Sequence, residues 1–375
     1  MLASIMSDVR RVMVVCGTRP EAIKLAPVIL ELRRRPHQFE TRVVVTAQHR
    51  ELLDQVLRVF EIEADEDLDI MRDGQTPFEI TVRVFEGLRP VLEREQPDLV
   101  ICQGDTTTTF AAALASFYLK TRVAHVEAGL RSGDKLHPFP EEVNRRLTSV
   151  IADFHFAPTG ASRDNLLAEG VSPETVFVTG NTVIDALLLA SDVPGPSPAD
   201  DVGAEARVVL VTAHRRENWG APMEEIMKAV VDIADTVDDV QVLMSVHPNP
   251  RVRETVERVL AGHPRIRIID SVDYAPFVKV MRRASIILTD SGGIQEEAPS
   301  LGVPVLVLRT VTERPEGVAA GTVRLVGVDR GDIVASALEL LRDPVAYERM
   351  AHAANPYGDG HASERIVDIL ARELG

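Results

Sequence analysis

Short apolar runs alternate with longer segments of helical periodicity along almost the whole chain. In the first half these runs are RVMVVCG at 11–17, TRVVVTA at 41–47, PDLVICQGD at 97–105 and RVAHVEAG at 122–129. Strands that are apolar throughout, rather than alternating, are typical of a parallel sheet covered by helices on both faces. The pattern therefore predicts an α/β protein built from doubly wound parallel sheets.

The alternation stops at 191–206, where Pro, Asp and Gly are frequent, and restarts at 207. We interpret 191–206 as a linker, because this composition has no periodicity. A length of 375 residues suits two domains. The expected order is a Rossmann-like domain at 1–190, a second one at 207–355 that faces it across a cleft, and a C-terminal helix at 356–375 with the N-terminal domain as one candidate packing partner.

Composition argues against several kinds of partner. The chain has 57 acidic and 41 basic residues, a net charge of −16, and only 4% aromatic residues. This balance disfavours nucleic acid and anionic membrane surfaces. No apolar run is long enough to span a membrane, and the N-terminus lacks a signal-peptide pattern. Cys16 and Cys102 end apolar runs and are expected to be core thiols, so we expect a cytoplasmic protein.

The stretch TDSGGIQEEAPSLG at 289–302 reads as a strand end, a Gly-Gly turn and a helix start. Ligands of open α/β sheets bind at the carboxyl ends of strands. Ser291, Gly292 and Gly293 could offer backbone N–H groups to a diphosphate, and Glu297 could accept hydrogen bonds from a ribose diol. Arg314 follows the next strand and would reach the same rim. An ordinary glycine-rich turn is the alternative.

Candidate charged residues in the first half also follow apolar runs. Arg19 and Lys24 lie near a helix start, where the helix dipole disfavours cations, so an anion or a carboxylate is expected nearby. Asp105 follows the third run, with a helix N-cap as the alternative role. Glu127 ends the fourth run, where partial burial can raise the pKa of a carboxyl group toward neutral and suit it to acid–base catalysis.

Two further motifs carry candidate residues. In HPFPEEVNRR, Glu141 and Glu142 lie at a helix start; we expect Glu141 to point inward and the other to be a surface residue. In TAHRREN, His214 and Arg215 follow the first strand of the second domain. A histidine there could neutralise or protonate a phosphate leaving group, although a lone histidine is more often structural.

Several common cofactor motifs are absent from the sequence. No G-x-G-x-x-G follows the first strand, there is no P-loop and no G-x-S-x-G, and no His or Cys pair has metal-ligand spacing. Phosphate-binding groups in one domain and carboxylates in the other suit a nucleotide sugar. This reasoning leaves glycosyl transfer, hydrolysis and epimerisation open.

Long sequence blocks resemble one known family. GTRPEAIKLAPVI, VTAQHRELLDQVL, QGDTTTTFAAALA, HVEAGLRSGD, PFPEEVNRRLT, TGNTVIDAL, TAHRREN, TDSGGIQEEAPSLGVPVLVLR and TERPEGVAAGTVRLVG together resemble the bacterial non-hydrolysing UDP-N-acetylglucosamine 2-epimerases. The resemblance implies a glycosyltransferase B-type fold and interconversion of UDP-GlcNAc and UDP-ManNAc. UDP would leave to give 2-acetamidoglucal and then re-add, with no metal or NAD.

The resemblance also implies residue roles. The acid–base carboxylates would be Asp105, Glu127 and Glu141, with His214 near the UDP phosphates. Contacts to the diphosphate, cleft, ribose and uracil would come from Arg19, Lys24, Val272, Phe277, Ser291, Gly292, Gly293, Glu297 and Arg314. Relatives can carry a polar residue in place of Val272, which leaves a backbone contact to uracil.

Three further properties follow from the resemblance alone. A second UDP-GlcNAc could bind as an activator at Gln48, Glu51, Arg215 and His247, although Glu51 and Gly74 stand where some relatives carry Gln and Arg. A homodimer and a role in supplying cell-envelope polysaccharide are expected. The rival functions are a UDP-glycosyltransferase, a hydrolysing epimerase and a nucleotide-sugar-binding regulator without turnover.

Overall fold

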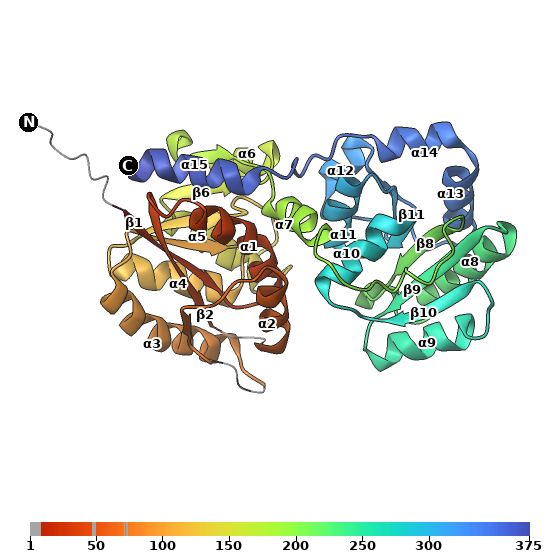
Figure 1. Cartoon of the computed structure of the whole chain (residues 1–375), viewed down its shortest axis with the longest axis horizontal. Helices are drawn as coiled ribbons and strands as arrows, with labels where there is room; N and C mark the ends of the chain where they lie inside the picture. Colours follow the sequence, from red (N-terminus) through yellow and green to blue (C-terminus); the bar gives the residue numbers. More distant parts are fainter. Residues whose placement is uncertain (1–8, 47–49, 71, 73) are drawn as a thin grey trace, which may run out of the picture. The chain divides into compact units, whose positions relative to one another are not determined.

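The chain contains two sheets, and in each of them all the strands are parallel (Figure 1). The structure is a computed structural model that describes residues 9–46, 50–70, 72 and 74–375. The chain divides into two units. The first holds the described residues up to Leu189 together with Tyr357–Gly375, and the second is Ala190–Pro356. The predicted α/β architecture with doubly wound parallel sheets is confirmed.

The first unit contains a seven-stranded sheet in the order β3-β2-β1-β4-β5-β6-β7. Its central strands are buried because both faces are covered, as their continuous apolar sequences predict. The strands are β1 (Arg10–Cys16), β2 (Phe39–Val45), β3 (Glu66–Asp67), β4 (Leu99–Gln103), β5 (Arg122–Val126), β6 (Phe154–Ala157) and β7 (Val176–Val178).

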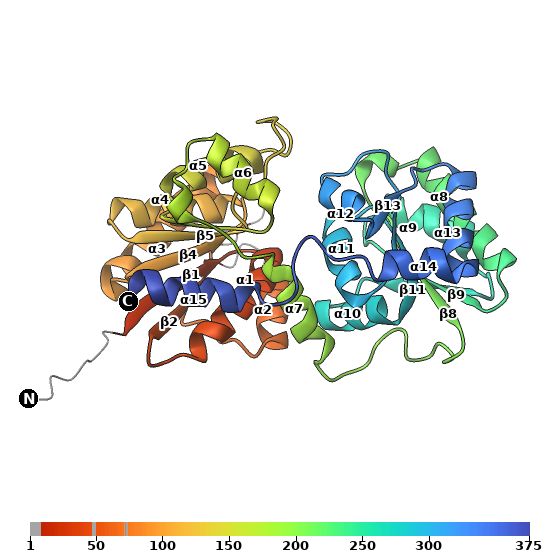
Figure 2. The same ribbon diagram turned by 90° about the horizontal axis from the view of Figure 1, so that it is seen from above.

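Helices cover both faces of this sheet (Figure 2). Helices α3 and α4 pack on a core that includes Met13, Val15 and Val100. On the other face, α1 packs against the C-terminal helix α15, and Arg35 is ion-paired with Asp368. The helices are α1 (Arg19–Arg33), α2 (Arg50–Val59), α3 (Pro77–Glu95), α4 (Thr107–Tyr118), α5 (Glu141–Ile151), α6 (Gly160–Ala168), a 3-10 turn (Pro173–Thr175), α7 (Thr182–Ser191) and α15 (Ala362–Leu374).

The second unit contains a six-stranded sheet in the order β10-β9-β8-β11-β12-β13. The order reverses between β8 and β11, which is where a doubly wound sheet offers a ligand site at its carboxyl edge. The strands are β8 (Arg207–Thr212), β9 (Val240–Val246), β10 (Ile266–Asp270), β11 (Ala284–Thr289), β12 (Val305–Val307) and β13 (Val323–Leu325).

One continuous apolar core lies under α8, α9 and α13 of this unit, with Met227, Val242 and Leu340 among its buried side chains. The helices are α8 (Ala221–Thr236), α9 (Pro250–Leu260), α10 (Tyr274–Arg283), α11 (Gly292–Glu297), α12 (Pro315–Ala320), α13 (Arg330–Arg342) and α14 (Pro344–Ala351), with 3-10 turns at Arg216–Asn218 and Ala298–Leu301. No helix in the described ranges has the length and apolar character that crossing a membrane requires.

The segment between α7 and β8 has neither helix nor strand, but it is held in place. Arg283 of α10 donates hydrogen bonds to the carbonyl oxygens of Gly203, Ala204 and Ala206. Lys279 donates to the carbonyl of Gly195 at 2.6 Å. These contacts tie the segment to the second unit, so its Pro- and Gly-rich composition does not leave it free.

Candidate active site

Glu127 directly follows β5, in a left-handed backbone conformation with φ of 64°. This conformation is costly for a residue with a Cβ atom and is found where surrounding contacts impose it, frequently at functional sites. The turn continues through Gly129, where an added Cβ would lie 2.2 Å from the carbonyl oxygen of Ser162. The tight turn directs the Glu127 side chain toward the ends of neighbouring strands.

The Glu127 carboxylate accepts hydrogen bonds from the side chains of Lys24, Gln103 and Asn181. Lys24 of α1 and Asn181, which precedes α7, both bind Oε1, and the Asn181 bond is 3.0 Å long. Gln103, the last residue of β4, binds Oε2. The Glu127 side chain is only 6% exposed, so these partners replace the water that would otherwise stabilise its charge. Lys24 was predicted to lie near an anion or a carboxylate, and the Glu127 carboxylate is that group.

Asp105 lies at the end of β4 and is ion-paired with Arg145 of α5. Its Oδ2 accepts from both Nη2 and Nε of Arg145, the latter at 3.1 Å. The cap of α4 is Thr106, whose hydroxyl accepts from the Thr109 N–H. The capping alternative for Asp105 is therefore wrong, because the neighbouring threonine fills that role.

The glutamate pair at the start of α5 differs from the sequence expectation. Glu142, rather than being at the surface, is fully buried; it accepts from the Ser132 N–H at 2.9 Å and is ion-paired with Arg145 and Arg146. Glu141 is half-buried, and its Oε2 is buried with no hydrogen-bond partner in the described part of the chain. Glu142 thus stabilises the loop that contains Ser132, whereas Glu141 has a carboxylate oxygen without a hydrogen-bond partner in the described structure.

Glu21 is a buried carboxyl group at the start of α1 that the sequence analysis did not single out. It accepts from the Gly17 N–H at 2.9 Å and from the Thr18 hydroxyl at 2.7 Å. Burial raises its pKa to about 7, against the lowering effect of these hydrogen bonds and of one from Thr106. Glu21 fixes the turn after β1, from which the predicted residue Arg19 extends with an exposed side chain.

His125 fixes the turn that carries Asp105. Its Nε2 is 2.7 Å from the Gly104 carbonyl oxygen, and burial lowers its pKa to about 4. The ring is therefore neutral near pH 7, with the proton on Nε2 donated to Gly104. Gly104 has φ of +75°, and an added Cβ would lie 3.8 Å from the Glu127 carboxylate.

In the second unit, two guanidinium groups flank the glycine turn after β11. A Cβ added at Gly292 would lie 3.8 Å from Arg215 Nη2 and 3.9 Å from Arg314 Nη2. Arg314 is also ion-paired with the buried Glu296, which fixes its position. Ser291 precedes the first turn of α11 without capping it through its side chain. Backbone N–H groups and two cations thus meet at one point, an arrangement suited to a diphosphate.

Asp290 organises the adjacent strand end. It is fully buried, and its Oδ2 accepts from the backbone N–H groups of His214 and Arg215, both at 2.9 Å. Its Oδ1 lies 3.4 Å from Nδ1 of His214, whose pKa is lowered, chiefly by burial. The His214 ring stacks on His247 with centroids 5.4 Å apart.

Glu297 ends α11, and its carboxylate is held by Tyr274 of α10. The Tyr274 hydroxyl donates to Glu297 Oε2 at 3.0 Å, while Oε1 would lie 3.3 Å from a Cβ added at Gly293. Val272 precedes α10 and Phe277 lies within it, both half-buried. These residues occupy the loop and first turns beside the glycine turn, within one unit.

A pocket of about 490 Å³ lies beside His214 and is lined by Arg215, Arg216, Glu217, Trp219, His247 and Asn249. It contains two of the residues predicted for a second nucleotide sugar, Arg215 and His247. The other two predicted residues cannot be placed against this pocket. Gln48 lies outside the described residues, and the structure describes only the position of Glu51 within α2.

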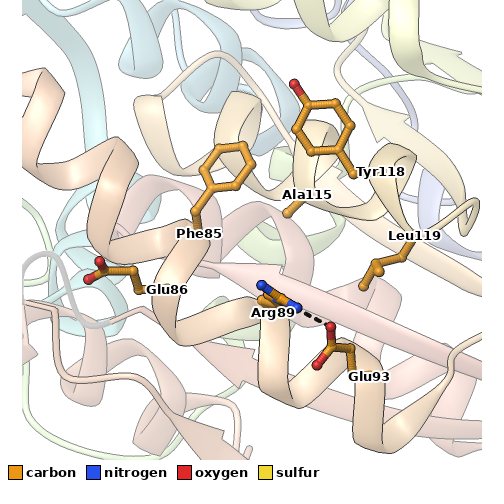
Figure 3. A pocket seen from close by; sticks show the side chains of 7 residues that line it. All are labelled: Phe85, Glu86, Arg89, Glu93, Ala115, Tyr118 and Leu119. Atoms are coloured by element: carbon orange, nitrogen blue, oxygen red, sulfur yellow. Dashed lines mark hydrogen bonds and ion pairs between the residues drawn. The ribbon is translucent and has the colours of Figure 1, made fainter.

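A groove of about 430 Å³ lies between α3 and α4 (Figure 3). Phe85, Tyr118 and Leu119 give it an apolar lining, and an ion pair between Arg89 and Glu93 borders it. None of the predicted site residues lines it. It lies toward the ends of α3 and α4 that lead into β4 and β5, away from the carboxyl edge of the sheet.

Each unit therefore brings its own predicted residues together. Lys24 and Glu127 are in contact in the first unit, and in the second the guanidinium groups of Arg215 and Arg314 both lie beside Gly292. The sequence analysis missed Asn181, Arg145, Glu21, Asp290 and Tyr274. Asn181 and Arg145 fall within quoted sequence blocks, but only the fold reveals their partners. In the described ranges, no group of three or more His, Cys, Asp or Glu side chains could hold a metal ion.

Two parallel-sheet domains with ligand-type residues at their carboxyl edges define a protein of the glycosyltransferase B-type fold. A glycotransferase of kitacinnamycin shares this architecture, with a TM-score of 0.66 over 98% of this chain and 100% of that one. Its sequence identity is 13%, so the likeness shows the fold alone.

The family model for UDP-N-acetylglucosamine 2-epimerase matches residues 30–371. The UDP-N-acetylglucosamine 2-epimerase of Escherichia coli K12 is 53% identical over 371 residues, covering 96% of this chain and 98% of that protein. The crystal structure of UDP-GlcNAc 2-epimerase from Neisseria meningitidis bound to UDP-GlcNAc is 48% identical, with a TM-score of 0.86 over 96% of this chain and 100% of that one. The chain belongs to the family of bacterial non-hydrolysing UDP-N-acetylglucosamine 2-epimerases, which confirms the family predicted from the sequence blocks.

Proposed function

We propose that this protein catalyses the reversible C2 epimerisation of UDP-GlcNAc to UDP-ManNAc. The C2 proton passes to a protein carboxylate while the C1–O bond breaks and its electrons leave with UDP, giving 2-acetamidoglucal. A UDP oxygen then attacks C1, and a proton is delivered to C2 from the opposite face. The product supplies ManNAc-type sugars for cell-envelope polysaccharide.

The observation that carries this proposal is the environment of Glu127. The Glu127 carboxylate is shielded from solvent, and the Lys24 ammonium favours its ionised form, in which it can accept a proton. Its backbone has a positive φ, which is found most often where surrounding contacts impose it at functional sites. Family membership supports the substrate, because the Neisseria relative is described as bound to UDP-GlcNAc.

In the first unit, Asp105, Glu127 and Glu141 are assigned to proton transfer on the sugar. Arg145 beside Asp105 and Lys24 beside Glu127 stabilise the charged forms of those carboxylates. Glu141 has an unsatisfied buried oxygen that a sugar hydroxyl or amide could satisfy.

In the second unit, the residues around Gly292 are assigned to UDP. The glycine turn with Arg314 would bind the diphosphate, joined by Ser291, Gly293 and, from the first unit, Arg19. His214 would stabilise the departing diphosphate, whose negative charge grows as the C1–O bond breaks. Glu297 would bind the ribose hydroxyls, and Phe277 with the backbone at Val272 would bind uracil.

Two finer properties are proposed from the family. A second UDP-GlcNAc would bind as an activator beside His214, and Arg215 and His247 support this because they line the same pocket. Arg215 also lies beside Gly292, so it could contact both nucleotides. The protein would act as a homodimer.

Incubation with UDP-GlcNAc in deuterated water, without any acceptor, tests the function. We expect UDP-ManNAc with deuterium at C2, and deuterium at C2 of the recovered UDP-GlcNAc. Product formed without C2 exchange would rule out the elimination mechanism. An unchanged sugar would favour a transferase or a binding protein, and irreversible release of free ManNAc with UDP would favour a hydrolysing epimerase.

A further inference from the structure

Asn181 is a buried residue between β7 and α7 whose side chain and backbone both make hydrogen bonds. Its Nδ2 donates to Glu127 Oε1 at 3.0 Å, and its Oδ1 accepts from the Val183 N–H at 3.1 Å. Its backbone N–H donates to the carbonyl oxygen of Tyr357 at 2.6 Å. Its relative exposure is 3%.

The side-chain bonds require an amide. The oxygen caps the first turn of α7, which fixes the orientation of the group and turns the NH₂ toward Glu127. Because both ends are occupied, Asn181 cannot rotate without losing either the helix cap or the carboxylate. Asn181 therefore helps to set the direction of the Glu127 carboxylate, together with Lys24 and Gln103.

The backbone bond connects this amide to the segment where the chain returns from the second unit. Pro356 is the last residue of the second unit, and Tyr357 is the first residue of the returning segment. Two glycines permit the close approach: a Cβ at Gly358 would lie 3.4 Å from the Asn181 nitrogen, and one at Gly180 would lie 3.4 Å from the Gly358 Cα. Both have positive φ, so a side chain at either position would also strain the backbone.

Just beyond, the returning segment is anchored to α7. Asp185 accepts from the N–H groups of Ala362 and Ser363, at 3.2 and 2.7 Å, and from the Ser363 hydroxyl at 2.5 Å. These bonds satisfy the start of α15. The segment at 357–361 is therefore fixed at one end to α7 and joined at the other end to the second unit.

We propose that Asn181 is a positioning residue for Glu127 and that it makes the orientation of this carboxylate depend on the returning segment. The inference rests on the proposed function, in which Glu127 exchanges a proton with C2. A displacement of Tyr357 would move the Asn181 backbone, and its amide would carry the change to Glu127 Oε1. The acid–base group is thereby tied to the chain crossing between the units.

The first test is Asn181→Ser. A serine hydroxyl can still cap the Val183 N–H but is too short to reach Glu127. We expect kcat to fall at least about tenfold and the acidic limb of the pH–rate profile to move up by about one pH unit, because a donor to the charged carboxylate is lost. Lys24 and the neutral His125, which also lie near Glu127, are unchanged in this variant.

Binding of UDP provides a readout that the amide should not affect. Trp219 is the only tryptophan in the sequence, and it lies in the second unit with its Nε1–H bonded to the His214 carbonyl at 3.1 Å. UDP titrated against Trp219 fluorescence should give the wild-type Kd within about twofold for Asn181→Ser. A kcat loss without a Kd change separates positioning from general damage.

Asn181→Asp covers the case in which the serine variant does not fold. It keeps the size and the helix cap but places a second carboxylate against Glu127. We expect a larger shift of the acidic limb to higher pH, because a like charge disfavours the charged form of Glu127. Wild-type kcat and pH profile in either folded variant would overturn the positioning role.

Gly358→Ala tests the link to the returning segment, and Ser363→Ala is the matched control in the same segment. The alanine at 358 crowds the Asn181 nitrogen, so we expect the pH shift and kcat loss of Asn181→Ser in weaker form. Ser363→Ala removes a bond to Asp185 without touching Asn181 and should keep the wild-type profile. A lower Tm for Gly358→Ala with an unchanged profile would overturn the link. If the wild-type enzyme itself shows no exchange at C2, the proposed function fails, whatever the variants do.

Discussion

The ammonium of Lys24 and the carboxylate of Glu127 form an ion pair that joins α1 to the turn after β5, with side-chain exposures of 16% and 6%. Removing such an ion pair from water costs free energy. The attraction between the two charges offsets this cost only when other hydrogen bonds satisfy the remaining donor and acceptor positions of the charged groups. Here Gln103 and Asn181 donate further hydrogen bonds to the Glu127 carboxylate. The pair keeps a charged carboxylate at a strand end where a purely structural role would favour an apolar contact.

Glu127→Gln and Asp105→Asn should each lower turnover at least ~10²-fold, the usual scale for lost acid–base catalysis. UDP binding should remain near the wild-type value, because the residues assigned to UDP lie mainly in the second unit. Steady-state kinetics and Trp219 fluorescence titration measure the two quantities. Weak UDP binding by a well-folded Glu127→Gln protein would contradict the assigned role.

Substitution of the two glutamates at the start of α5 should have different effects, on turnover for Glu141 and on folding stability for Glu142. Glu141→Gln should lower turnover and leave the Tm close to wild type, because its Oε2 has no partner in the described structure. Glu142→Ala should cost about 3 kcal/mol of folding free energy, because it removes a fully buried carboxylate that accepts a hydrogen bond from the Ser132 N–H and is ion-paired with Arg145. Chemical denaturation and kinetics of both variants provide the comparison, and the reverse pattern would refute it.

Glu297→Gln should weaken UDP binding about tenfold, because a charge-assisted hydrogen bond to the ribose becomes a neutral one. Binding of 2′,3′-dideoxy-UDP should be nearly the same in both proteins, since this analogue lacks the hydroxyls in question. Tyr274→Phe should shift UDP affinity in the same direction but less, because it removes one hydrogen bond that orients the Glu297 carboxylate and leaves the carboxylate itself in place. Equal losses for UDP and the dideoxy analogue would argue against ribose recognition.

Glu21→Gln should alter how stability depends on pH. The pKa of Glu21 is raised from 4.5 to about 7, so its contribution to stability is fully present below pH 4.5 and is lost as the pH rises through 7. The glutamine variant lacks this loss. It should match wild type near pH 5 and exceed it by about 1–3 kcal/mol near pH 8. Thermal unfolding at both pH values measures the difference, and a constant difference would show that Glu21 is charged throughout.

The sequence was sufficient to predict the architecture and to locate most of the charged residues at strand ends. Apolar parallel strands can be recognised from short stretches of sequence, and ligand-binding residues follow such strands at the carboxyl edge of the sheet. The sequence analysis placed Glu142 wrongly at the surface, since the helix dipole favours a glutamate at a helix start whether or not the side chain is buried. It also missed Asn181 and Arg145, whose partners Glu127 and Asp105 lie 54 and 40 residues away. A buried amide or guanidinium acquires its role from the fold, which no local pattern records.

The packing of α15 on α1 has a consequence for synthesis. Arg35 and Asp368, which meet in this contact, are separated by 333 positions, and the whole second unit is translated between them. During synthesis, the side of α1 that packs against α15 stays exposed until α15 leaves the ribosome, because α15 is the last helix of the chain. A chain truncated before residue 362 should therefore leave uncovered the side of α1 that α15 contacts in the full-length protein.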